Sequence, residues 1–186
     1  MSTIAHISLA QYEIMVRHGA FDGKHHQRVE LLRGEIRQMN PIGEPHAEAV
    51  VELTDWSYET APRQQVKIRV QSTLRLPRSE SAPEPDLVWV ERKDYSARHP
   101  GPEDVLLLVE VADTSLDQDR GEKLRLYAEA GIDDYWIIDL VDRCIEVYRG
   151  PANGTYRHVD RYTSGTLLHP LKFPHIELEP SRILVP

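Results

Sequence analysis

Two acidic residues and a lysine stand where a charged side chain could do chemistry. Asp86 opens the apolar stretch "DLVWV", and Glu110 lies near the centre of the aliphatic run "VLLLVEVADTS". A run of this kind is typical of a strand buried on both faces, where an isolated carboxylate carries a heavy desolvation penalty. Glu110 therefore requires a metal ion, a cationic partner or a cleft that admits water. Lys123 follows in the next predicted helix.

If the two strands are neighbours, the carboxylates of Asp86 and Glu110 converge on one point. Together with a backbone carbonyl, which we assign to Val111, and several waters, they form an oxygen ligand set that suits Mg²⁺, with Mn²⁺ as a substitute. Such an ion lowers the pKa of a bound water and stabilises charge on a phosphate oxygen undergoing displacement. An ammonium group such as Lys123 could orient the attacking water or offset that charge.

Each of these residues also has a structural interpretation. An acid after Pro85 at the start of a strand often only caps a turn. Glu110 and Lys123 could form a structural ion pair, because buried acids usually have such partners. The acids at 113, 117 and 119 are most simply first-turn residues of the following helix, and Tyr135 and Trp136 are expected to pack in the core.

The elements that must position these residues follow from periodicity. Short helices are predicted over residues 8–19, where Ser8 and Gln11 fit a capping box, and 46–61. Two short strands joined at Arg33-Gly34 are predicted within 28–39, and one alternating strand over 64–77. A strand at "DLVWV", the buried strand 105–111, a helix from about 117 to Gly131 and three strands within 134–140, 144–150 and 156–165 complete the pattern. The prediction is an α+β fold: a mixed sheet with a strand–helix–strand unit at its centre.

Composition limits the class of protein. A chain of 186 residues with 40% hydrophobic and 28% charged residues is expected to form a single domain, with no segment long enough to cross a membrane. No signal peptide is evident, and the single cysteine allows no intrachain disulfide, so a cytoplasmic location is expected. The nine histidines show no H-x-x-x-H and the cysteine no C-x-x-C spacing, which argues against zinc.

The charge distribution leaves one candidate surface for nucleic acid. A net charge of −8 argues against a general nucleic-acid coat protein. No acid occurs between Thr60 and Ser79, however, and the polar face of the predicted strand 64–77 carries Lys67, Arg69 and Arg75. These three residues are candidates for contact with a phosphate backbone; the alternative is an ordinary solvated strand face.

The blocks "RVELLRGEIRQMNPIGEPH", "PEPDLVWV", "LLLVEVADTSLDQDRGEKLRLYAEAGIDDYWIIDL" and "IEVYRGP" resemble, in order, the signature blocks of the bacterial Uma-type family of restriction endonuclease-like proteins. This family, long a domain of unknown function, falls within the PD-(D/E)XK nuclease superfamily. The resemblance runs from about Val29 to Gly150. It implies a restriction-endonuclease-like domain over 1–186, with an N-terminal helical segment (1–28) and a C-terminal β or irregular extension (151–186).

The resemblance also implies roles for particular residues. The superfamily places its lysine two residues after the glutamate, a position that here is Ala112. The family lysine is similar to one moved onto the following helix, which Lys123 fits. Glu30 is implied as a further catalytic carboxylate, and His46 matches a family position whose role the sequence does not define.

Three functions follow as hypotheses. The first is a Mg²⁺-dependent endonuclease acting on DNA, with Asp86 and Glu110 as metal ligands, Lys123 and Glu30 completing the catalytic set, and a homodimer cutting both strands. The second is a catalytically silent nuclease-fold module that binds a protein or DNA partner. The third is a metal hydrolase for another phosphodiester, such as RNA or a nucleotide; it ranks last because no basic stripe interleaved with aromatic residues is present.

Overall fold

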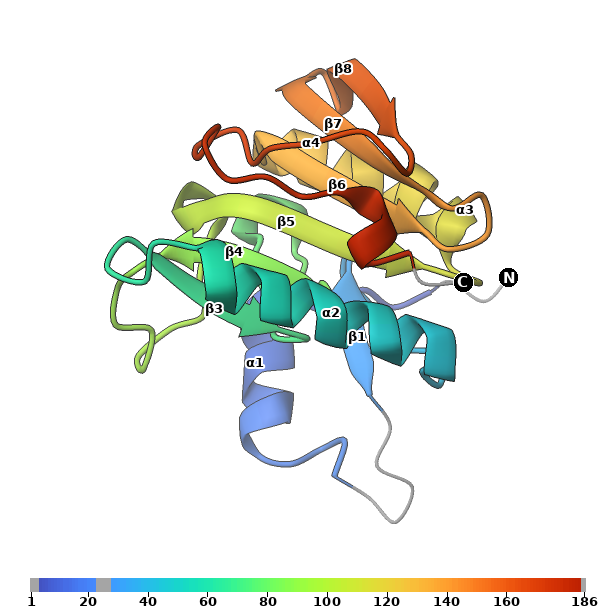
Figure 1. Cartoon of the computed structure of the whole chain (residues 1–186). Coiled ribbons are helices and arrows are strands. Elements are labelled where there is room, and N and C mark those ends of the chain that lie inside the picture. The colour runs from blue at the N-terminus through green and yellow to red at the C-terminus, as the bar shows by residue number, and fades with distance from the viewer. Residues whose placement is uncertain (1–3, 23–27, 185–186) are drawn as a thin grey trace.

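The computed structural model describes residues 4–22 and 28–184, and its centre is a six-stranded mixed sheet (Figure 1). Strands β5 and β6 are parallel, and every other neighbouring pair is antiparallel. A parallel pair needs a crossover connection, which the helical segment between β5 and β6 supplies. The predicted strand–helix–strand unit in an α+β fold is therefore confirmed. In spatial order the strands are β3 (Val66–Val70), β4 (Leu87–Glu91), β5 (Val105–Ala112), β6 (Asp134–Asp139), β7 (Cys144–Ala152) and β8 (Thr155–Tyr162).

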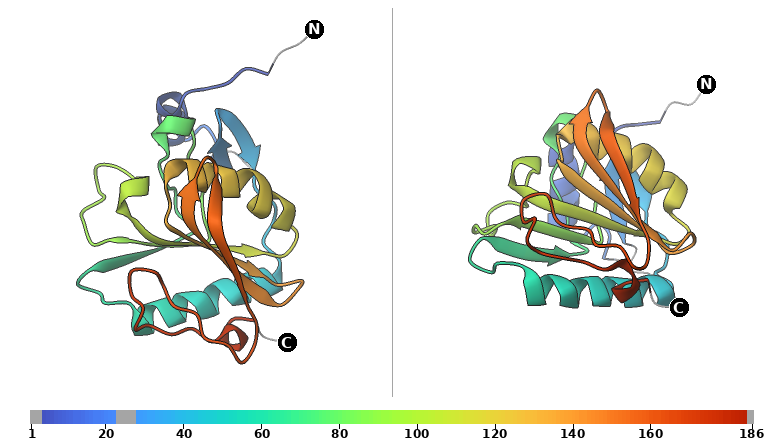
Figure 2. Two further views of the ribbon diagram at one scale, coloured as in Figure 1. Left: turned by 90° about the horizontal axis from the view of Figure 1, so that it is seen from above. Right: turned by 45° about the horizontal axis from the view of Figure 1, so that its top comes forward.

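Structure covers both faces of the sheet (Figure 2). Helix α2 (Glu44–Thr60) and the C-terminal segment pack on one face, where Trp56 donates a hydrogen bond to the Glu177 carbonyl at 2.9 Å. Helix α1 (Leu9–Arg17), the hairpin of β1 (Val29–Leu32) and β2 (Glu35–Gln38), and the helical crossover lie on the other face. Side chains of β5 alternate between the two cores: 107, 109 and 111 face α2, while 108 and 112 face the crossover.

The N-terminal elements form as their sequences predict. The Ser8 hydroxyl caps the Gln11 amide, the Gln11 side chain caps the Ser8 amide, and Gly19 takes a φ of 69° just beyond the helix end. Helix α2 begins two residues earlier than predicted, with Gly43 as its N-cap. Residues 1–3 and 23–27 of the predicted N-terminal segment and residues 185–186 of the predicted C-terminal extension fall outside the described residues. Strand β8, within the predicted C-terminal extension, is an edge strand of the main sheet.

The crossover is not one regular helix. It consists of α3 (Leu116–Gln118), a π-helical turn (Asp119–Lys123) and α4 (Leu124–Ala130), and it ends at Gly131 with a φ of 80°, as predicted. A π-helical turn changes which side chains face the sheet, and such turns are frequent at functional sites. Here both ends of the turn, Asp119 and Lys123, are buried.

The prediction of one alternating strand over 64–77 is wrong beyond Val70. Strand β3 ends there, and Gln71 takes a φ of 43°, which turns the chain. Leu74 and Leu76 consequently join the core on the crossover side, whereas Ile68 packs against the α2 core. Alternation could not reveal this turn because the residues after it happen to keep the same apolar period. No helix in the described ranges is long and apolar enough to span a bilayer.

Candidate functional site

Strand register brings Asp86 and Glu110 together. In the antiparallel β4–β5 pair, Leu87 lies opposite Val109 and Val88 opposite Leu108. Continuing this register by one residue places Asp86 opposite Glu110, and directly opposed side chains have Cβ atoms about 4.5–5.5 Å apart. Both residues line one pocket, and the charge of Asp86 contributes to raising the pKa of Glu110. The expected convergence of the two carboxylates is present.

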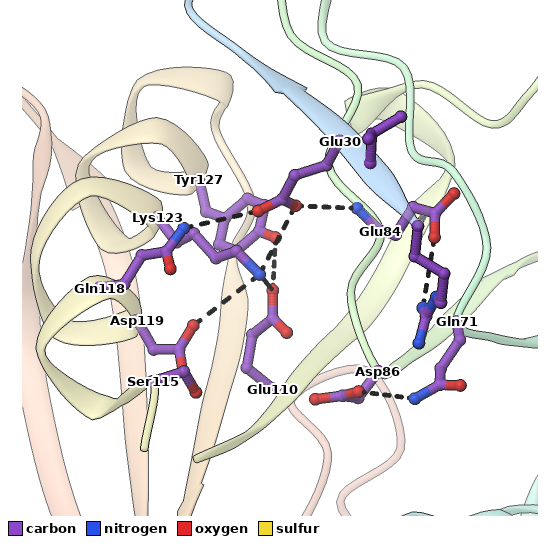
Figure 3. A network of polar contacts seen from close by, with 12 residues as sticks. Glu30, Gln71, Glu84, Asp86, Glu110, Ser115, Gln118, Asp119, Lys123 and Tyr127 are labelled. Carbon is purple, nitrogen blue, oxygen red and sulfur yellow. Dashed lines mark hydrogen bonds and ion pairs between the residues drawn. The ribbon is translucent and has the colours of Figure 1, made fainter. Parts of the chain in front are cut away.

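Glu110 is held from the crossover side. Its Oε1 accepts hydrogen bonds from Lys123 Nζ at 3.0 Å and from the Tyr127 hydroxyl at 2.7 Å (Figure 3). Lys123 and Tyr127 are four residues apart, so both reach the same point from successive turns of the helix. Alternation along β5 explains why Glu110 faces this helix and not α2. The ion pair that was the structural interpretation of Glu110 is therefore present, within the same pocket as Asp86.

Lys123 lies among three carboxylates. Besides Glu110, its Nζ is 3.7 Å from Glu30 Oε2 and 3.9 Å from Asp119 Oδ1 (Figure 3). Burial would lower the pKa of Lys123, but these carboxylates raise it above its ordinary value, so the side chain stays an ammonium. Glu30, on β1, is also within 3.5 Å of the Gln118 amide. The hairpin thus supplies an acid to a site built on the main sheet.

Asp86 accepts hydrogen bonds from three separate segments of the chain. Val111 N–H donates to Oδ2 at 2.9 Å, His46 Nε2 lies 3.1 Å from the same oxygen, and the Gln71 amide donates to Oδ1 at 3.2 Å. Burial raises the pKa of Asp86, but the hydrogen bonds from His46, Val111 and Gln71 hold it below its ordinary value. Asp86 is therefore a charged carboxylate at neutral pH and not simply the cap of a turn.

These residues line a pocket of about 250 Å³ whose walls are acidic. Within the described residues, its lining holds six carboxyl groups and three Lys or Arg side chains, so acidic groups outnumber basic ones two to one. Buried like charges repel unless a cation joins them, so the excess favours a bound cation. The acids are Glu30, Glu84, Asp86, Glu110, Asp113 and Asp119, and the cations are Arg28, Arg37 and Lys123.

The burial of Glu110 predicts a pH-dependent stability. Burial raises the pKa of Glu110 from 4.5 to about 8, although Lys123 opposes the shift. The native state thus holds this proton more tightly than the unfolded chain, and stability falls as pH rises from about 4.5 through the raised pKa. In EDTA at pH 9, Glu110→Gln is expected to unfold about 2–4 °C above the native protein, roughly 1 kcal/mol, because it removes an ionised buried carboxylate while Lys123 keeps Glu30 and Asp119 as partners. The difference should be smaller at pH 5.5.

Thermal unfolding of both proteins at the two pH values checks this expectation. Tyr127→Phe, which removes a hydrogen bond to the same carboxylate without changing a charge, is the control. A Glu110→Gln protein that unfolds below the native protein at pH 9 would show instead that the ionised Glu110–Lys123 pair stabilises the fold.

The three basic residues predicted to contact nucleic acid do not line this pocket. Lys67 donates to the Lys93 carbonyl at 2.7 Å and lies over the Tyr95 ring. Arg75, beyond the end of β3, pairs with Glu13 at 2.6 Å, so it no longer shares a strand face with Lys67 and Arg69. Arg28 and Arg37, which sequence reasoning did not single out, do line the pocket. They reach the pocket because the hairpin packs over the main sheet, and no pattern in the sequence predicts that packing.

A second group of potential metal ligands is already neutralised. Asp139, Cys144 and Glu146, on β6 and β7, bring one ligand atom each within 4.8 Å of one another. The guanidinium of Arg120 lies among them, with hydrogen bonds of 2.8 Å to Asp139 and of 2.7 and 2.9 Å to Glu146. Arg120 thus already pairs with both carboxylates of this group.

Two residues of the site were assigned other or no roles from the sequence. The sequence predicts Asp119 as an ordinary first-turn acid of the helix, but the π-helical turn buries it, and it accepts a 2.6 Å hydrogen bond from Ser115. His46 lies 40 residues before Asp86 and is brought to it by α2. Only the family position of His46 could have suggested it. The core positions predicted for Tyr135 and Trp136 are confirmed.

The fold is the restriction-endonuclease-like mixed α+β fold that the sequence predicts. A solved structure of a DUF820 protein from Anabaena variabilis ATCC 29413, titled a "putative nuclease", superposes with a TM-score of 0.72 over 96% of this chain and 97% of that chain. The two sequences are 13% identical, so the likeness concerns the fold. No curated protein matches the chain.

The family is established by sequence. The model of the Uma2 family, described as "Putative restriction endonuclease", matches residues 10–181. The chain belongs to this family, and the resemblance found in its signature blocks is thereby confirmed.

Proposed function

We propose that this protein is a Mg²⁺-dependent endonuclease that hydrolyses DNA phosphodiester bonds. The observation that carries the proposal is the convergence of Asp86, Glu110 and Lys123 in one acidic pocket. A phosphodiester is itself an anion, so a pocket with an excess of carboxyl groups would repel it unless a cation were bound there. Family membership and the fold of the DUF820 protein support the same class of reaction.

The donor set fits a magnesium ion. Asp86 and Glu110 would hold it with hard oxygen atoms, with the backbone carbonyl of Val111 as the proposed third ligand. Bound there, Mg²⁺ supplies a water of lowered pKa and stabilises charge on the phosphate. Lys123, charged and held among carboxylates, would orient the attacking water, and Glu30 would keep the ammonium in place from the opposite side.

DNA contacts complete the proposal. Arg37 lines the pocket with 44% of its side chain exposed, and its guanidinium pairs with Glu35 at 2.6 Å. Exchanging this exposed ion pair for a phosphate beside the cleaved bond is the contact that we propose for it. The assignment of Lys67, Arg69 and Arg75 to the phosphate backbone stays a prediction for more distant contacts. Two copies of the site would be needed to cut both strands, so we propose a homodimer.

Duplex binding in Ca²⁺ by Arg37→Ala and Arg75→Ala would compare the contribution of the pocket residue Arg37 with that of the predicted basic residues around Arg75.

Metal dependence tests the proposed function directly. Mn²⁺ at about 100 times its dissociation constant is expected to stabilise the native state by about 2.7 kcal/mol, which raises the unfolding temperature by roughly 5–10 °C. Supercoiled plasmid is expected to be nicked or linearised in Mg²⁺ or Mn²⁺ and to stay intact in EDTA. Asp86→Asn protein, purified identically, controls for a contaminating nuclease.

The silent binding module is favoured by one specific observation, the direct 3.0 Å contact between Lys123 and Glu110. If this pair is purely structural, millimolar Mn²⁺ leaves the unfolding temperature unchanged and no plasmid is cut. That combined outcome would replace the endonuclease proposal by the binding module. Equal cutting by native and Asp86→Asn proteins would contradict the catalytic assignment.

A further inference from the structure

His46 carries the further inference, which rests on the proposed function. It is the third residue of α2, and its ring bridges from that helix to the start of β4. Among the described residues, its Nδ1 is buried without a hydrogen-bond partner, while its Nε2 lies 3.1 Å from Asp86 Oδ2. A histidine kept only for packing or fold stability would normally satisfy both ring nitrogens. Here Asp86 is the only hydrogen-bond partner of the ring among the described residues.

The bonds around Asp86 decide which of its oxygen atoms can bind a cation. A carboxylate oxygen offers about two lone-pair directions. Oδ2 uses both, one for Val111 N–H at 2.9 Å and one for His46. Oδ1 uses one, for the Gln71 amide at 3.2 Å, and keeps the other. We propose that His46 is a positioning residue that locks the Asp86 carboxylate so that Oδ1 alone is presented to the divalent cation, as a monodentate ligand.

The other bonds to Asp86 do not make His46 redundant. Val111 N–H on β5 is one donor to Oδ2, at 2.9 Å, and the Gln71 amide donates to Oδ1 at the longer distance of 3.2 Å. Without His46, Oδ2 keeps only the Val111 bond, so its second lone pair becomes available to a cation and Oδ1 is no longer the only free ligand atom of Asp86. Partners that orient metal ligands in this way typically change metal affinity by 10- to 100-fold when they are removed.

Calorimetric titration of Mn²⁺ into purified variants of the 186-residue chain tests the inference. His46→Ala is expected to weaken Mn²⁺ binding about 10- to 100-fold. His46→Gln, whose amide can still donate to Oδ2, is expected to restore affinity to within a few-fold of native. Glu48→Gln, an exposed change on the same helix, is the matched control and should leave affinity unchanged.

A metal-free measurement separates this inference from the proposed function. Crystal structures of the metal-free variants are expected to show Asp86 in a second rotamer in His46→Ala and in the native rotamer in His46→Gln. An unmoved Asp86 in His46→Ala, or equal losses of affinity in both His46 variants, would overturn the positioning role. If the native protein binds no Mn²⁺, the proposed function fails, while the rotamer of Asp86 still decides whether His46 positions it.

Discussion

Replacing Asp86 by Asn is expected to lower plasmid cutting by at least about 10³-fold, since a metal-held water and charge stabilisation together supply several kcal/mol of the barrier reduction. The amide keeps the size of the side chain, so the fold should persist. It loses the negative charge that three hydrogen bonds hold in place and that a divalent cation requires. The rise in unfolding temperature with Mn²⁺ should disappear with the activity.

Initial rates of plasmid relaxation and Mn²⁺ titration of thermal unfolding measure the two effects. Asp113→Asn removes the same charge from the same pocket, at a residue outside the proposed ligand set, and is expected to change the rate less than tenfold. A similar loss in both variants would indicate that the overall negative charge of the pocket matters and that Asp86 has no specific role as a ligand.

Lys123→Met should produce the largest loss of stability among changes at the site. The substitution leaves Glu110, Glu30 and Asp119 buried around an uncharged side chain. Removing one partner of a buried ion pair typically costs about 3–5 kcal/mol. Because a cation bound between the same carboxylates would replace part of the lost charge, Mn²⁺ should stabilise this variant more than it stabilises the native protein.

Cutting by Lys123→Met is expected to fall about 10²- to 10³-fold, the usual consequence of removing one charged or hydrogen-bonding group beside the reacting atoms. Denaturant unfolding with and without Mn²⁺, and rates measured at saturating metal, separate the loss of stability from the loss of rate. Arg125→Met removes an exposed cation two residues further along the helix and should affect neither. A stable but inactive Lys123→Met protein would instead assign the lysine to chemistry alone.

The sequence by itself determined the order of the elements and the unusual position of a carboxylate, Glu110, within an aliphatic run. Alternation as far as Val70, the capping box at Ser8 and the glycine at 131 are local signals, so they can be recognised without knowledge of the fold. A carboxylate in an aliphatic run is also a local signal, because burial of such a run follows from its composition. These features were enough to predict the sheet and the crossover, and they left a metal ion, a cleft or Lys123 as the possible compensation for Glu110.

Only the tertiary structure decided which polar side chains surround these carboxylates. His46, Gln71 and Glu30 come from three separate segments, and no periodic pattern in the sequence reports how these segments pack against β4 and β5. The π-helical turn that buries Asp119 depends on how the crossover fits the sheet, and the turn at Gln71 is hidden because the apolar period continues past it. Local patterns report one element at a time, whereas the surroundings of a charge are set by contacts between elements distant along the chain.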